Sequence, residues 1–231
     1  MNAKITIITP TTGSSTLFNL IKSLEKQTVP FMHILLWDDK RDGDFLYPDP
    51  YTLKTKHVDS LNADNRYNIV IKGSLVQGEA SGSALRSIGL MAANTEFVTF
   101  ADSDVWYENN HLETLLNTIG DKNWAYCRRK VWASETDYIG VDNFESVGDS
   151  SERKVPYEMV DNNCMIFRRR YGTSGAVLYR ETTSYNDDRL FYAFLKKHAG
   201  IPSKTDLATV NQICPARLEN FFRMGCTCQK S

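Results

Sequence analysis

Short apolar runs alternate with helical spacings of apolar residues through the first 120 positions of the chain. Apolar, β-branched runs predict buried strands, and leucines or isoleucines three and four positions apart predict helices. The pattern predicts strands at residues 4–9, 33–37, 67–71 and 97–101, and helices at residues 17–24, 81–93 and 112–119. Strand, helix and strand in this order are typical of βαβ units, which build parallel sheets. The fold class expected from this half is therefore α/β.

From about residue 123 the pattern changes to short aromatic and charged runs. These predict antiparallel strands mixed with loops, at residues 124–132, 138–141, 165–170 and 176–179. A helix is predicted at residues 187–197, where Leu190, Phe191, Phe194 and Leu195 share one apolar face. A last helix is predicted at residues 207–222, interrupted near Pro215. Residues 40–66 are polar and contain two prolines, and they predict a long loop of the kind that is usually functional.

Composition and charge exclude several classes of protein. The chain has 231 residues, of which 42% are hydrophobic and 24% charged, as in ordinary globular proteins and unlike disordered or collagen-like chains. Its net charge of -1 gives no excess positive charge for coating a nucleic acid, so no nucleic-acid partner is expected. No stretch approaches the ~20 apolar residues of a membrane span. Five cysteines without a Cys-x-x-Cys pair favour a reduced, cytoplasmic protein.

Polar residues follow three of the predicted strands at their carboxyl ends, where ligands bind in open α/β sheets. They are Thr9-Pro10-Thr11-Thr12, Asp38-Asp39 and Asp102-Ser103-Asp104. Asp is also a common turn residue, so one acidic pair alone has a structural explanation, whereas two in one βαβ series favour a site. Asp102 and Asp104 are two residues apart on an extended segment, so their carboxylates point the same way. Such oxygens suit Mg²⁺ or Mn²⁺, with positions left for the phosphates of a nucleotide.

Three segments resemble the family 2 glycosyltransferases of the GT-A fold. The run GSALRSIGLMAANTEFVTFADSDVWYENNHLETLL is similar to the family's helix with an Ala-Arg-Asn-like triplet, followed by a strand and Asp-x-Asp. KITIITPTTGSSTLFNLIKSLEKQT resembles its first strand and helix, and ILLWDD its second strand. The resemblance implies a mixed, mainly parallel, Rossmann-like sheet flanked by helices in a single domain, residues 1–231. Residues 1–120 would bind the nucleotide sugar, and the more irregular residues 121–231 the acceptor.

The resemblance also implies an inverting transfer of a sugar from a nucleotide-diphosphate sugar, expected to be a UDP-sugar, to a hydroxyl group of a glycan or glycoconjugate. Asp39 would bond the base, Arg86 would lie near the nucleotide or its diphosphate, and Asp104 would ligate Mn²⁺ or Mg²⁺ directly. Asp102 would face the ribose or share the metal. The residues implied in donor binding are Thr9, Pro10, Thr11, Asp39, Arg86, Asp102 and Ser103. Ser87 stands where the family usually has Asn, and a surface ion pair is the alternative role for Arg86.

The family places its catalytic base at the start of a helix in the second half, which here is Asp187-Asp188. Asp187 lies three and four residues before Leu190 and Phe191, on the predicted apolar face, and Asp188 is turned about 100° away. Asp187 is therefore the predicted base and Asp188 the second choice. The alternative is that both carboxylates only complement the N-terminal dipole of the helix.

Two other functions stay open. A sugar-phosphate nucleotidyltransferase usually has a Gly-rich, Arg-bearing loop after its first strand, and TPTTGSSTL has one Gly and no Arg. A non-catalytic module that binds a sugar or a partner would share the fold. Of the remaining features, Arg128-Arg129-Lys130 and Arg168-Arg169-Arg170 predict solvated faces. His111 is expected at the surface, and Trp106 and Tyr107 are either core residues or a platform for a sugar.

Overall fold

The computed structural model describes residues 3–39, 66–72, 81–151, 154–171, 175–176 and 187–225. In the first half the four predicted strands are confirmed as β1 (Ile5–Thr11), β2 (Phe31–Asp39), β3 (Arg66–Lys72) and β4 (Phe97–Phe100). They pair in parallel in the order β3-β2-β1-β4. The sheet therefore reverses its strand order between β1 and β4. In open α/β sheets the crevice at the carboxyl ends of two such strands is the usual ligand site.

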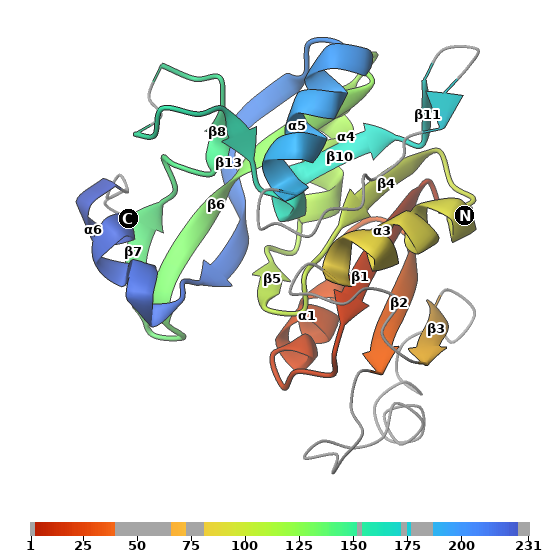
Figure 1. Cartoon of the computed structure of the whole chain (residues 1–231), viewed down its shortest axis with the longest axis horizontal. Helices are drawn as coiled ribbons and strands as arrows, with labels where there is room; N and C mark the ends of the chain where they lie inside the picture. The colour runs from red at the N-terminus through yellow and green to blue at the C-terminus, as the bar shows by residue number, and fades with distance from the viewer. Residues whose placement is uncertain are drawn as a thin grey trace.

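The second half adds strands to the same sheet (Figure 1). They are β5 (Val105–Tyr107), β6 (Trp124–Ser134), β7 (Asp137–Val141), β10 (Met165–Arg168) and β13 (Ser203–Ile213). The order continues β4-β10-β6-β13-β5, and β7 pairs with the last residues of β6, beyond the part that pairs with β10. Two small hairpins are made by β8 (Ser146–Gly148) with β9 (Met159–Val160) and by β11 (Arg170–Tyr171) with β12 (Gly175–Ala176). The fold is thus α/β with a mixed sheet.

The predicted helix at residues 207–222 is wrong. Residues 203–213 form β13, which lies parallel to β6 and antiparallel to β5. Only after Pro215 does the chain turn helical, as the short helices η3 (Ala216–Leu218) and α6 (Glu219–Gly225). Leu207, Val210 and Cys214 have helical spacing, but pairing on both edges with distant strands overrides that local preference.

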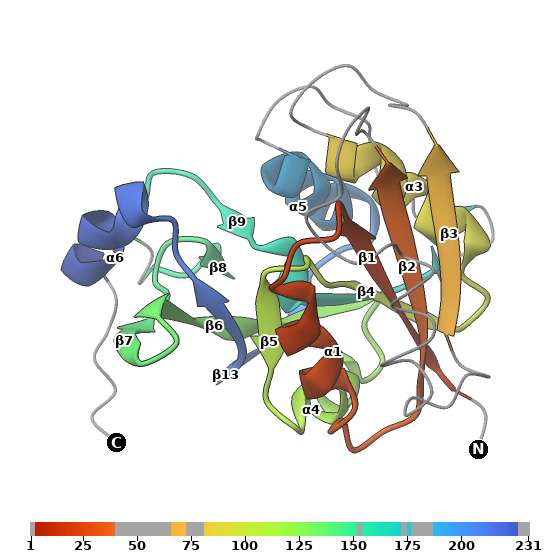
Figure 2. The ribbon, with the colours of Figure 1, turned by 90° about the horizontal axis from the view of Figure 1, so that it is seen from below.

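Helices cover both faces of the sheet. They are α1 (Leu17–Leu24), α3 (Ser81–Ala92), α4 (His111–Ile119) and α5 (Asp187–His198). Figures 1 and 2 show α3 and α5 on one face and α1 and α4 on the other. None of the helices in the described ranges is long and apolar enough to span a membrane.

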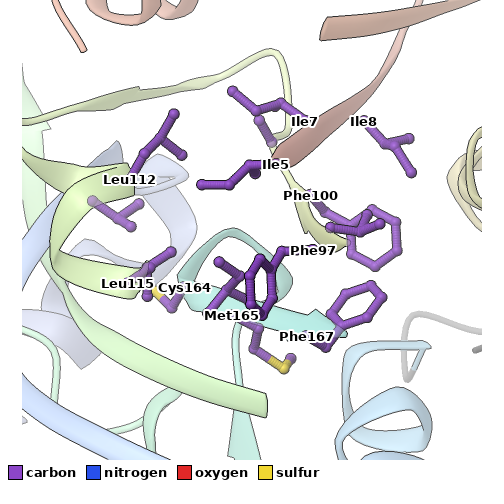
Figure 3. Packing of buried hydrophobic residues seen from close by; sticks show 14 of the residues in the cluster. Ile5, Ile7, Ile8, Phe97, Phe100, Leu112, Leu115, Cys164, Met165 and Phe167 are labelled. Atoms are coloured by element: carbon purple, nitrogen blue, oxygen red, sulfur yellow. The ribbon is translucent and has the colours of Figure 1, made fainter. Parts of the chain in front are cut away.

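The core lies between this sheet and its helices. Figure 3 shows side chains from β1, β4, α4 and β10 packed together, among them Ile7, Phe100, Leu115 and Phe167. On the face covered by α3 and α5, the ring of Phe191 on α5 packs edge-on against Phe100 and Phe167, with ring centroids 5.5 and 5.2 Å apart. This packing holds the first turn of α5 close to the end of β4.

The buried face of α5 differs from the predicted one. Leu190 is 40% exposed, whereas Phe191, Tyr192 and Leu195 are buried. Tyr192 replaces Leu190 in the core because its ring packs edge-on against Trp124, with centroids 5.5 Å apart. Asp188 lies three and four residues before two buried side chains, Phe191 and Tyr192, whereas Asp187 precedes only Phe191 at such a spacing, so Asp188 is nearer the centre of the buried face.

Gly89 lets α3 approach the sheet. A Cβ atom at this position would lie 2.4 Å from Cγ2 of Ile8 and 3.0 Å from Cδ1 of Leu36. Gly89→Ala is expected to lower the free energy of unfolding by about 1–3 kcal/mol, because α3 must shift off its strands. Urea denaturation measures the change. Met91→Ala on the same helix, at a side chain that is 72% exposed, is the control and should change stability by less than about 0.5 kcal/mol. Equal unfolding midpoints for Gly89→Ala and the wild type would contradict the close packing.

Candidate active site

Arg86 on α3 joins two of the predicted site carboxylates. Its side chain is buried, and Nη2 donates to Oδ1 of Asp102 at 2.5 Å while Nη1 donates to Oδ2 of Asp187 at 3.0 Å. The guanidinium carbon also lies 5.8 Å from the ring centre of Phe100. One cation therefore ties α3, the end of β4 and the first turn of α5 together. The guanidinium is buried while both partner carboxylates are partly exposed, so Arg86 does not form the surface ion pair that was the alternative.

Asn163, which sequence reasoning missed, orients Asp102. It lies in η2 (Asn162–Cys164), and its amide oxygen accepts the backbone N–H of Asp102 at 2.6 Å. Its amide nitrogen donates to Oδ2 of Asp102 at 3.1 Å. Both oxygens of Asp102 are thus engaged, one by Arg86 and one by Asn163. The polar run Asp161-Asn162-Asn163 before an apolar strand was the sequence signal for these residues.

Asp188 lies beside this cluster and is half-buried. Its carboxylate accepts a hydrogen bond from the side-chain amide of Asn162. Burial raises the pKa of Asp188 well above its ordinary value of 3.8. The negative charge of Asp161 adds to this, and the positive charge of Arg86 opposes it. Asp188 therefore binds a proton more tightly than an ordinary aspartate does, as a general base needs. Asp187 is instead held by the Arg86 guanidinium.

Asp104 stands at the accessible side of the site. Its side chain is exposed to solvent, and Oδ2 accepts a hydrogen bond from Nε2 of Gln212 on β13 at 3.3 Å. Although solvent reaches this side chain, the surrounding protein displaces part of the water around the carboxylate, which raises the pKa of Asp104, and the negative charge of Asp102 raises it further. Two carboxylates that repel one another are the donor set that a divalent cation relieves, so these residues fit Mg²⁺ or Mn²⁺.

The protein alone offers that cation few ligands. Within the described ranges no group of three or more His, Cys, Asp or Glu side chains is placed to hold a metal. Asp102 already gives its oxygens to Arg86 and Asn163. A metal here would therefore take Asp104 as its main protein ligand, with the other positions left to phosphate oxygens and water.

A buried charge network supports the site from the second half of the chain. Arg129 is 3% exposed, although its run was predicted to be solvated. Its guanidinium pairs with Asp142 at 2.8 Å, Glu145 at 2.8 Å and Asp161 at 2.5 Å. Burial raises the pKa of Asp161 to about 6, although the charge of Arg129 lowers it. The sequence prediction was wrong because the three acids are distant in sequence.

This network reaches Asp102 of the candidate site through one residue, Asn163. Oδ1 of Asp161 accepts hydrogen bonds from both the backbone and the side-chain nitrogen of Asn163, at 2.8 and 2.7 Å. The same side-chain nitrogen of Asn163 donates to Asp102. A continuous polar path therefore runs from Arg129 through Asp161 and Asn163 to Asp102.

The first-strand residues lie at the same edge of the sheet but differ in accessibility. Thr9 is fully buried, and its hydroxyl is hydrogen-bonded to Nε2 of His33 at 3.0 Å, so only its backbone could face a ligand. Thr11 is also buried and accepts the backbone N–H of Gly13 at 3.0 Å, while Pro10 between them is half-buried. Asp39 is the last residue of β2, and its side chain lies outside the described part of the structure.

Trp106 and Tyr107, each predicted to be either a core residue or a platform for a sugar, differ in burial. Tyr107 is a core residue, 3% exposed, whose hydroxyl donates to the carbonyl of Phe100 at 3.0 Å. Trp106 on the same strand is half-buried and keeps part of its ring at the surface. His111 is fully buried rather than at the surface, stacked on Tyr107 and bonded to Thr209 at 2.8 Å.

Comparison of the sequence with known proteins finds glycosyltransferases. None of the protein-family models searched matches the chain. It is 35% identical over 97 residues to the glycosyltransferase GlyA of Streptococcus pneumoniae, a match that covers 42% of this chain and 13% of that protein. It is 29% identical over 103 residues to EpsH of Bacillus subtilis, which has a provisional glycosyltransferase name; this match covers 44% of the chain and 26% of EpsH. The matches thus span only 13% and 26% of these relatives' length.

Comparison of the structure shows the fold over nearly the whole chain. Staphylococcus aureus TarS superposes with a TM-score of 0.66 at 19% identity, over 96% of this chain and 38% of TarS. TarS 1–349 in complex with UDP-GlcNAc gives 0.64 at 20% identity, over 92% of this chain and 59% of that one. The complex with UDP gives 0.64 at 19% identity, over 96% and 63%. These likenesses show a GT-A glycosyltransferase fold.

Proposed function

Because the chain has a GT-A glycosyltransferase fold, we propose that it transfers a sugar from a nucleotide-diphosphate sugar to a hydroxyl group of a glycan or glycoconjugate. The observation that carries this proposal is the convergence of Arg86, Asp102, Asp187 and Asp188 at the carboxyl edge of the sheet. A buried cation among acids, beside an accessible Asp104, is the charge arrangement that a diphosphate and its counter-ion need. The name of GlyA supports a glycosyltransferase activity. The UDP-GlcNAc and UDP complexes of TarS support a UDP-sugar as donor.

In this proposal the donor lies across the carboxyl ends of β1, β2 and β4. Pro10 and the backbone of Thr9 and Thr11 border the nucleotide, and Asp39 accepts a hydrogen bond from the base. Ser103 lies between the two acids of the Asp-x-Asp sequence, next to the ribose. Arg86 provides the buried positive charge that attracts the diphosphate and keeps Asp102 oriented.

Asp104 and Asp102 are proposed to hold Mn²⁺ or Mg²⁺. When bound, such a cation neutralises the charge that develops on the leaving diphosphate. The chain's own contribution is to keep the two carboxylates at one end of a buried strand. Arg86 and Asn163 fix Asp102, and the hydrogen bond from Gln212 fixes Asp104.

Asp188 is proposed as the general base of an inverting displacement. The base takes the proton of the acceptor hydroxyl as its oxygen attacks the anomeric carbon. Burial raises the pKa of Asp188, and its hydrogen bond to Asn162 fixes one oxygen. Asp187 is held by Arg86 instead, and its role in this proposal is to position the guanidinium. The sequence favoured Asp187 as the base and Asp188 as the second choice, and this proposal reverses that order.

Binding of the donor tests the proposed function. UDP and UDP-sugars are expected to raise the melting temperature of the protein, and more so with Mn²⁺, because they bind only the native state. Asp39→Ala should weaken UDP binding by about 1–3 kcal/mol in calorimetry, since it removes one hydrogen-bond partner of the base. Asp121→Ala, at an exposed acid after α4, is the control. If no nucleotide stabilises the protein, the proposal is wrong, and stable binding without hydrolysis or transfer would favour a non-catalytic module.

A further inference from the structure

Figure 2 shows α1 beside β5, on the face of the sheet opposite to α3 and α5. A groove lies between these two elements. Its volume is about 300 Å³, and its lining includes Asn19, Lys22 and Lys26 from α1 and the turn after it, with Trp106, Asn109 and Glu135 opposite. Asn19, Lys22 and Lys26 are three and four residues apart, so they face the same way. The groove uses none of the residues proposed to bind the donor or to act as base.

Trp106 gives the groove an aromatic wall that continues beyond it. Its ring centroid lies 6.0 Å from that of Trp132 on β6, which in turn lies 4.9 Å from Tyr138 on β7. The indole N–H of Trp132 is satisfied by Asn211 at 3.0 Å. The indole N–H of Trp106 has no hydrogen-bond partner among the described residues. A half-exposed ring with an available donor is typical of a surface that stacks on the apolar face of a sugar ring and bonds its hydroxyls.

The charges of the groove select the chemistry of its ligand. Lys22 and Lys26 are exposed, and neither forms an ion pair within the described ranges. The only acid lining the described groove is Glu135, which accepts a hydrogen bond from the amide of Asn19 at 3.4 Å. The groove therefore has a positive excess although the whole chain has a net charge of -1. An acidic group on the ligand is the natural partner for these two ammonium groups.

A protein partner fits this surface less well. The core of a protein interface is apolar and depleted in charged residues. None of the exposed large apolar side chains of the described ranges lines the groove; these are Met91, Leu190, Ile201, Leu207 and Met224. Lysine, asparagine and glutamate around one tryptophan are instead suited to a hydroxylated, charged chain.

The groove also begins close to the proposed reaction centre. Asp104 lies in the turn just before β5, and Trp106 follows it by two residues, which is at most about 7 Å of chain. On the neighbouring strand β13, Gln212 contacts Asp104 and Asn211 pairs with Trp106, so these two residues lie beside the same path. A polymer whose end reaches the carboxylates could thus continue along the groove.

We propose that this groove is a second saccharide site, which binds an acidic carbohydrate chain bearing phosphate or carboxylate groups. Trp106 stacks on a sugar ring of that chain, and Lys22 and Lys26 bind its acidic group. Identification of the chain as the acceptor rests on the proposed function; the binding site itself does not.

The test follows the indole N–H signals of the four tryptophans by NMR in nucleotide-free protein. The Trp106 signal is the one missing from Trp106→Ala. Hexagalacturonate and a phosphorylated dextran oligomer provide the two kinds of acidic group, and maltohexaose is the neutral chain. Both acidic chains are expected to shift the Trp106 signal, with dissociation constants about tenfold below that of maltohexaose at low salt. The Trp124 signal should stay in place, because that indole is buried and bonded to the carbonyl of Gly200 at 2.7 Å.

Charge-removing variants complete the test. The double variant Lys22→Met/Lys26→Met should bind the acidic chains about tenfold more weakly, like the neutral chain. Lys197→Met, at an exposed lysine on α5, should bind them as the wild type does. An unshifted Trp106 signal overturns the proposal, as do equal affinities for acidic and neutral chains. Failure of UDP to bind would remove the proposed transferase function but leave these shifts unchanged, so the two ideas fail separately.

Discussion

Asp188→Asn is expected to lower the rate of sugar transfer by about 10²-fold or more and to leave UDP binding unchanged, since the amide cannot take up the acceptor proton. The wild-type rate should rise with pH through the pKa of the base. Because burial raises that pKa, the acid limb of the profile should lie above the range of an ordinary aspartate. Transfer assays from pH 4 to 8, with calorimetry of UDP binding alongside, provide the measurement.

Asp187→Asn is the matched variant, one residue earlier in the same helix. It removes the partner of Nη1 of Arg86, so we expect a lower melting temperature and weaker donor binding, with the acid limb of the pH profile retained. A wild-type transfer rate in Asp188→Asn, with loss of transfer in Asp187→Asn, would return the role of base to Asp187. Wild-type rates in both variants would place the base elsewhere.

Stability separates a catalytic defect from a folding defect in Asp188→Asn. The folded-state pKa of Asp188 is raised above its unfolded value, so the carboxyl group contributes to stability at low pH. That contribution is lost as the pH rises through the folded-state pKa. At neutral pH the charged form opposes folding, and Asn carries no charge. The melting temperature of Asp188→Asn at pH 7 should therefore equal or exceed that of the wild type.

Asp104→Asn is expected to lower transfer by about 10²-fold or more, because a carboxylate that bridges a divalent cation to a diphosphate loses most of its effect with its charge. The variant should fold normally, since Asp104 is exposed and makes one weak hydrogen bond. In calorimetry it should also lose the gain in UDP affinity that Mn²⁺ gives the wild type.

Two comparisons make the metal prediction specific. Asp121→Asn removes an exposed acid outside the site and should leave transfer and the response to Mn²⁺ unchanged. EDTA in excess should inactivate the wild type, and added Mn²⁺ should restore it. Full transfer in excess EDTA, or by Asp104→Asn, would rule out the proposed metal-dependent mechanism.

The parallel half of the fold could be predicted from the sequence because its signals are local. Apolar runs ending at Thr9-Pro10 and at Asp102 define strand and strand end within a few residues, and the spacing from Leu17 to Leu24 defines a helix. The confirmed strands β1 to β4 and helices α1, α3 and α4 follow from such short-range patterns. The same local patterns placed Asp102 and Asp104 at the end of one strand, and the resemblance to family 2 glycosyltransferases added Arg86 as a candidate.

The second half was predicted less well because its structure depends on partners far along the chain. Residues 203–213 have helical apolar spacing but form β13 between β6 and β5. Arg129 lies in a charged run that resembles a solvated face, and only the fold brings Asp142, Glu145 and Asp161 around it. Neither outcome follows from local propensity, because each depends on pairing or burial against distant residues.

The choice between Asp187 and Asp188 also depended partly on local sequence and partly on distant contacts. The sequence by itself determined that a helix with an apolar face opens at Asp187-Asp188, and the family resemblance made these two acids the candidates for the base. Which acid faces the core depended on whether Leu190 or Tyr192 packs inward, and the ring of Trp124 on a distant strand decided that in favour of Tyr192. Only the tertiary structure placed Arg86 against Asp187 and Asn162 against Asp188. Local patterns define which residues share an element, whereas charge, burial and pKa are set by what packs against that element.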